Sequence, residues 1–182
     1  SSMADFGERI IGMMSEAHRQ ELLAILSAAE PYYEKIIWQA AQADLQQTLD
    51  SLKRLVPDME KAFDQLRHFY GAAYGDEQNF IVCVYPLPGK QGHSTATPHG
   101  NTLVLGAFVE GEDFAGRTGV AVHELCHVLY RSQPAALQGD LAEWFLVNPS
   151  AYSRLAYAYI DEALATACGN GWAYKQIIGK LE

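Results

Sequence analysis

The chain has 182 residues, of which 49% are hydrophobic and 19% are charged, and its formal net charge is −9. This composition is typical of a folded globular protein and excludes a disordered or fibrous one. The acidic balance, without any basic run, argues against nucleic acid or an anionic membrane as a partner. No apolar stretch approaches the roughly 20 residues that cross a bilayer, so no membrane span is predicted.

Three cysteines, Cys83, Cys126 and Cys168, are too few and too scattered for a disulfide framework. Cys126 and Cys168 are interpreted as small buried residues, with a disulfide between them as the alternative. The cysteine usage leaves the compartment open, with a lean toward a reducing one such as the cytoplasm.

The first 73 residues are predicted to be helical. Apolar residues recur there at steps of three and four, which is the pattern of amphipathic helices that bury one face in a core. Pro31 is expected to break the first of these helices. Pro57 is expected to mark the end of one helix and the start of another, because proline suits the first helical turn.

A strand is predicted at 79–85, because β-branched and aromatic residues dominate this stretch, and a second strand is predicted at 102–108. The segment 90–100 between them is rich in glycine, serine, threonine and proline, which favours a surface loop. His93 and His99 in this loop are interpreted as exposed polar residues rather than metal ligands.

Four helices are predicted in the rest of the chain, over 116–132, 135–147, 150–168 and 172–181. The Asn-Pro-Ser sequence at 148–150 is interpreted as the end of one helix and the start of the next.

The pattern His-Glu-x-x-His occurs at 123–127, inside a mostly apolar helical stretch. On a helix, His123 and His127 lie one turn apart and project from the same face, so both imidazoles can bind one metal ion. Glu124 lies beside them around the turn, where it can take a proton from water at the metal. The alternative is a helix with two satisfied core histidines.

A hydrolytic zinc site takes three protein ligands, so a third ligand is expected elsewhere. Tyr130 and Gln133 stand where metzincins have glycine and histidine, which excludes that family. Asp161 and Glu162 form an acidic pair that is followed by small residues, which allow two helices to approach closely. Two carboxylates of the preceding predicted helix are rivals, Asp140 and Glu143.

His-Glu-x-x-His followed a few tens of residues later by Asp-Glu-Ala on another helix resembles the gluzincins, the thermolysin-like zinc metallopeptidases. This resemblance covers about residues 100 to 170. It implies that His123, His127 and Glu162 bind one zinc ion per chain and that Glu124 is the general base. It also suggests that the strand at 102–108 is an edge strand that aligns an extended peptide, with an ordinary buried strand as the alternative.

Two features of the family have different counterparts here. Many gluzincins hold the first ligand histidine with an aspartate one turn after the ligand glutamate, where this chain has Thr166, and Asp161 is the candidate substitute. No histidine follows His127 to stabilise an oxyanion, so tyrosines are the candidate donors. Tyr157 and Tyr159 are the two named as catalytic, and Tyr152 and Tyr174 are the others available.

We therefore expect an α+β fold of zincin-like type, mainly helical with a small, mostly antiparallel sheet. One domain is expected over 1–182, with a helical part at 1–73 and with strands and catalytic helices at 79–182. The expected activity is zinc-dependent hydrolysis of a peptide or protein substrate. A non-catalytic zinc-containing domain that binds a partner is the alternative, and a metal-free helical interaction module is a third.

Overall fold

The computed structural model describes residues 2–75, 80–87, 89, 95–108 and 114–179. Three predicted features lie outside these ranges: the start of the first strand at Asn79, His93 in the loop, and the end of the last helix at Leu181. The chain divides into two compact units, residues 1–43 and 44–182. Each unit is described by itself, and the single domain over 1–182 stays a prediction.

The first unit consists of helices. Its elements are α1 (Met3–Arg9), α2 (Glu16–Tyr32), the π-helical segment η1 (Tyr33–Trp38) and the start of α3 (Gln39–Tyr70). Ser2 and Asp5 form a capping box, which satisfies free backbone N–H groups at the start of α1. Arg19 on α2 donates to the Gly7 carbonyl oxygen at 3.2 Å, which ties α2 to α1, and it pairs with Glu16 of its own helix at 2.7 Å.

Neither proline ends a helix, so both predicted breaks are wrong. Pro31 lies inside α2 and Pro57 lies inside α3. An internal proline removes one backbone hydrogen bond and crowds the preceding turn. Around Pro57 this local cost is outweighed because Leu52 and Ala62, on either side of it, are both buried in the second unit. Two residues after Pro31 the helix widens into η1, and π turns are one way in which a helix absorbs an irregularity.

The second unit contains a three-stranded sheet in the order β1-β3-β2. Its strands are β1 (Ile81–Leu87), β2 (Ala96–His99) and β3 (Thr102–Phe108). β1 pairs with β3 in parallel and β2 pairs with β3 antiparallel. The mainly helical fold with a small sheet is confirmed, but the mostly antiparallel sheet is wrong. The unpredicted strand β2 is the reason, because it reverses the chain between β1 and β3 and so leaves those two strands parallel.

The central strand of the sheet is β3, not an edge strand. Leu103 and Leu105 are fully buried, so the alternative of an ordinary buried strand is the correct one for 102–108. Within the described ranges, β2 pairs on one side only. The Gly106 N–H donates to the Thr95 carbonyl oxygen, so by the antiparallel alternation Ala96 and Pro98 point their backbone groups to the open side. Proline suits an edge position because it has no N–H to donate to a neighbouring strand.

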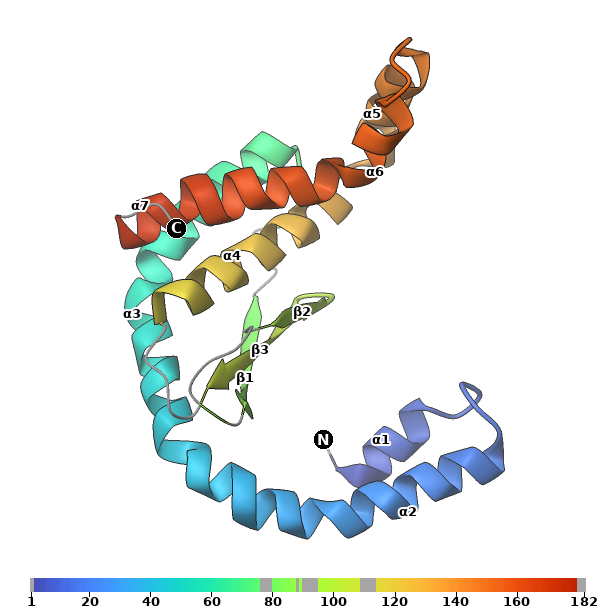
Figure 1. Cartoon of the computed structure of the whole chain (residues 1–182), viewed down its shortest axis with the longest axis vertical. Coiled ribbons are helices and arrows are strands. Elements are labelled where there is room, and N and C mark those ends of the chain that lie inside the picture. Colours follow the sequence, from blue (N-terminus) through green and yellow to red (C-terminus); the bar gives the residue numbers. More distant parts are fainter. Residues whose placement is uncertain (1, 76–79, 88, 90–94, 109–113, 180–182) are drawn as a thin grey trace. The chain divides into compact units, whose positions relative to one another are not determined.

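Helix α4 occupies the middle of the second unit, between the sheet and the continuous helix formed by α6, η2 and α7 (Figure 1). The helical elements are α4 (Phe114–Arg131), α5 (Ala135–Val147), α6 (Ser153–Leu164), η2 (Ala165–Ala173) and α7 (Tyr174–Ile178). The predicted interruption at 148–150 is confirmed, since α5 ends just before it. In the described ranges, no helix combines the length and the hydropathy that a bilayer crossing requires.

The core beside α4 is built from three helices. Leu66 and Tyr70 of α3, Cys126 and Leu129 of α4, and Ala165 of η2 are all buried in one apolar cluster. Burial raises the pKa of the Cys126 thiol to about 12, so this side chain is a neutral packing group, as predicted. Both cysteines of the alternative disulfide are free.

We expect Gly169→Ala to lower the free energy of unfolding by about 1–3 kcal/mol, the usual cost of overpacking. A Cβ atom at Gly169 would lie 2.7 Å from the His123 Cα atom, and backbone on both sides resists the shift. Urea denaturation measures the loss. Gly139→Ala on α5 is the matched control, because no atom lies within 4 Å of its Cβ position. Equal stability of the two variants would contradict the close approach of α4 and η2.

Candidate metal centre

His123 and His127 are brought together by one turn of α4, as their spacing predicts. Their Nε2 atoms are 3.1 Å apart, and the ring centroids are 4.8 Å apart. The core-facing residues Val122 and Cys126 fix the rotation of α4, so both imidazoles leave the helix toward α6. His127 is buried and His123 is half-buried.

Glu162 reaches the same point from α6. Its Oε1 atom is 3.2 Å from the His123 Nε2 atom and its Oε2 atom is 3.4 Å from the His127 Nε2 atom. The carboxylate therefore spans both imidazoles from the side opposite α4. The rival carboxylates Asp140 and Glu143 are exposed on α5, and no described ion pair joins either of them to a histidine.

Asp161 supports the second histidine rather than the first. Its Oδ1 atom is 2.8 Å from the His127 Nδ1 atom, so Nδ1–H donates to the carboxylate and the Nε2 lone pair is left for a ligand bond. The expectation that Asp161 holds His123 is wrong because α6 and η2 run opposite to α4. Asp161 meets His127, while Gly169 further along meets the backbone of His123.

The Nδ1 atom of His123 is buried and has no hydrogen-bond partner in the described structure. Thr166, which stands where many gluzincins have an aspartate, is exposed. The Oδ1 atom of Asn170 on η2 is likewise buried and unpartnered. The sequence analysis does not predict a role for Asn170, because its burial follows from the contact between η2 and α4.

Glu124 completes the group of donor atoms. The ligating atoms of His123, Glu124 and His127 all lie within 4.8 Å of one another, and these three residues could hold a metal ion. Burial raises the pKa of Glu124, while the nearby His127 and His123 oppose that rise. The half-buried carboxylate is thus in a position and an environment suited to a proton acceptor.

The tyrosines named from the sequence lie on α6 without a described contact to the imidazoles. Tyr157 is half-buried, with its ring 5.6 Å from that of Phe145, and Tyr159 is 62% exposed. Their catalytic role stays a prediction. Tyr130 is a further tyrosine on α4, three residues after His127. Burial raises its pKa, and the Tyr157 and Asp161 side chains add to the rise.

Comparison of the chain with protein-family models, with curated proteins and with solved structures finds no match. The resemblance to gluzincins and the zincin-like fold therefore stay predictions. They rest on the sequence motifs and on the geometry around His123, His127 and Glu162.

Asp161→Ala should weaken metal binding about 10- to 100-fold, because His127 loses the acceptor that orients its ring. Asp161→Asn should retain most of the affinity, since an amide oxygen can also accept from Nδ1–H. Competition titration against a chelator measures both affinities. Asp140→Ala removes an exposed carboxylate on α5 and is the control; an Asp161→Ala affinity equal to that of this control would refute the role of Asp161.

Proposed function

We propose that the protein is a zinc-dependent peptidase in which His123, His127 and Glu162 hold the metal and Glu124 is the general base. One observation carries the proposal: two Nε2 atoms and one carboxylate from separate helices converge on a single point, with a second carboxylate beside it. Histidine nitrogen and carboxylate oxygen in the ratio two to one are a ligand set of hydrolytic zinc sites.

The spacing of the donor atoms supports this assignment. Ligand atoms about 2.0–2.1 Å from a tetrahedral ion lie about 3.3 Å from one another. The separations among the two Nε2 atoms and the Glu162 oxygens are 3.1, 3.2 and 3.4 Å. The 3.2 and 3.4 Å separations belong to the two different Glu162 oxygens, so the three side chains lie at about the spacing of zinc ligands.

The acid–base work falls to Glu124. When bound, zinc supplies a Lewis acid that lowers the pKa of a water toward about 7 and polarises a carbonyl group. Glu124 would act as the general base: its carboxylate would accept a proton from the water that attacks the carbonyl carbon and would pass it to the amine nitrogen as the C–N bond breaks. Asp161 keeps the His127 ring oriented throughout.

The open edge of β2 supports a peptide as the substrate. β2 contacts α4, and among the described residues the N–H and C=O of Ala96 and the C=O of Pro98 face its unpaired side, where an extended chain can bind. A peptide paired there would run alongside the helix that carries the histidines.

The second candidate is a zinc-containing binding domain without hydrolytic activity. Two observations favour it: the unpartnered His123 Nδ1 atom, and a Glu124 carboxylate close enough to be a fourth ligand. A structural zinc site is closed by four protein ligands, whereas a hydrolytic site keeps one position for water. The two candidates therefore differ in what Glu124 does.

Purified protein should contain about one zinc per chain, as elemental analysis measures. Glu162→Ala should lose it, because the remaining histidines cannot close the site. Glu143→Ala, which removes an exposed glutamate on the neighbouring helix, should keep it. Zinc retained in Glu162→Ala and lost in Glu143→Ala would overturn the ligand assignment.

Glu124→Gln should keep the zinc and lower the rate of peptide cleavage by at least about 100-fold, the usual contribution of a general base. Cleavage of a mixed peptide library, followed by mass spectrometry, measures the rate, and Glu143→Gln is the control. Loss of zinc from Glu124→Gln would instead identify Glu124 as a ligand and favour the binding domain. Full activity of zinc-loaded Glu124→Gln would contradict the peptidase mechanism.

A further inference from the structure

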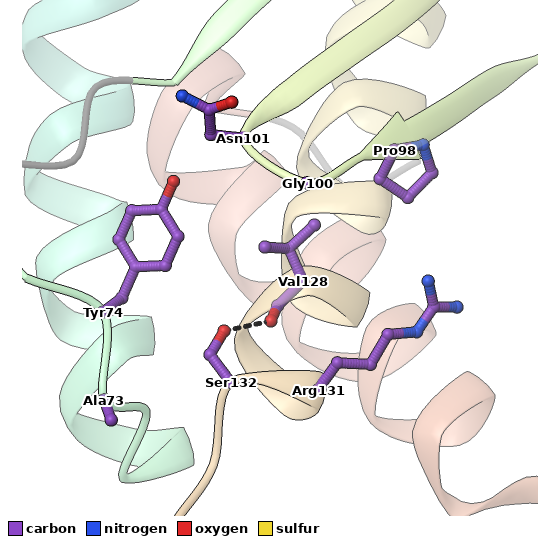
Figure 2. Close-up of a pocket in the computed structure, with 8 residues that line it drawn as sticks. All are labelled: Ala73, Tyr74, Pro98, Gly100, Asn101, Val128, Arg131 and Ser132. Atoms are coloured by element: carbon purple, nitrogen blue, oxygen red, sulfur yellow. Dashed lines mark hydrogen bonds between the residues drawn. The ribbon is translucent and has the colours of Figure 1, made fainter. Parts of the chain in front are cut away.

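A pocket of about 600 Å³ lies at the C-terminal end of α4 (Figure 2). The C-terminal turns of α4 form one wall, the turn between β2 and β3 forms another, and the segment after α3 forms the third. The residues that line it are Ala73, Tyr74, Pro98, Gly100, Asn101, Val128, Arg131 and Ser132. Its volume is within the range of small-ligand sites in proteins, about 300–1,000 Å³.

The charge of this pocket is positive, in a chain of net charge −9. Arg131 is the charged residue among those that line it. In the described part of the chain, Arg131 is exposed and its guanidinium forms no ion pair. Its five N–H donors are therefore free to bind an anion.

Tyr74 adds a second donor to the pocket wall. Its hydroxyl is buried and has no hydrogen-bond partner in the described structure. Figure 2 shows this hydroxyl directed toward the Asn101 end of the pocket. Ser132, by contrast, already donates to the Val128 carbonyl oxygen and is not available. A ligand that accepts hydrogen bonds would satisfy Tyr74 as well as Arg131.

The pocket lies on the same face of α4 as Glu124, one to two turns further along the helix. Glu124, Val128 and Arg131 are spaced by four and then three residues, so they lie on one face of the helix. The rise from Glu124 to Arg131 is about 10 Å at 1.5 Å per residue. An extended peptide covers that distance with about three residues.

We propose that this pocket binds a carboxylate side chain of the substrate peptide, two or three residues from the bond that is cleaved. The assignment rests on the proposed peptidase function and adds a substrate class to it, namely acidic peptides. A guanidinium binds a carboxylate through two parallel hydrogen bonds, which a neutral amide side chain cannot match. Arg117 of α4 is buried, whereas Arg131 is exposed at this pocket, so in a chain of net charge −9 this end of α4 attracts an acidic peptide.

The test measures binding, so it does not depend on catalysis. Acetyl-Ala-Glu-Ala-amide and acetyl-Ala-Gln-Ala-amide are titrated into the full chain carrying Glu124→Gln, and amide resonances at Val128, Arg131 and Ser132 are followed by NMR. We expect the glutamate peptide to shift these resonances and to bind about tenfold more tightly than the glutamine peptide, as one charged hydrogen-bonded pair provides.

Arg131→Gln should abolish this preference, and Arg154→Gln, which removes an exposed arginine on α6, should leave it unchanged. Tyr74→Phe should reduce it in part. Equal affinities for the two peptides, or a preference that survives Arg131→Gln, would overturn the inference. Inorganic phosphate that binds there more tightly than the glutamate peptide would also overturn it.

The experiments distinguish a failure of this inference from a failure of the proposed peptidase function. Zinc-dependent cleavage without a glutamate preference at Arg131 leaves the peptidase proposal standing and removes this inference. A glutamate preference in a protein that neither holds zinc nor cleaves peptides removes the peptidase proposal and leaves an acidic-peptide site.

Discussion

The close approach of α4 and the helix formed by α6 and η2 brings Asp161 and Glu162 to the two histidines of the candidate centre. Gly169 has no side chain, so the backbone of η2 lies against the backbone of α4 at His123. That contact sets the distance between the helices, and the buried Cys126 and Ala165 set their rotation. Without this approach the Glu162 carboxylate could not bridge two imidazoles that belong to another helix.

The acidic pair at 161 and 162 divides two tasks between neighbouring residues. Successive residues on a helix point about 100° apart, so one carboxylate can meet an Nε2 edge while the other meets an Nδ1 edge. Glu162 contacts both Nε2 atoms, and Asp161 contacts His127 Nδ1. Glu162 thus lies where a metal ligand would lie, next to the Nε2 atoms of both histidines. Asp161 orients the ring of His127 from its Nδ1 side.

The surface around this centre separates into faces of different character. The side of α4 toward β2 offers an open strand edge and the cationic pocket at Arg131, which suit an extended acidic chain. Helix α5 has no buried residue, and Trp144 on it is 65% exposed. Covering a large exposed aromatic side chain lowers the free energy, so such a surface favours contact with another molecule. This contact would not depend on the chemistry at the histidines.

Local pattern determined much of this structure. The four-residue spacing of His123 and His127 in an apolar stretch implied that both imidazoles share one face, because helix geometry alone dictates it. The range 135–147 matched α5, and 102–108 matched β3. Other features depended on partners distant in the sequence. The continuation of α3 through Pro57, the parallel pairing of β1 with β3, and the pairing of Asp161 with His127 rather than His123 are all outcomes of packing. A sequence specifies periodicity and propensity within a segment, whereas the direction and rotation of one segment against another are decided by the burial of whole faces at once.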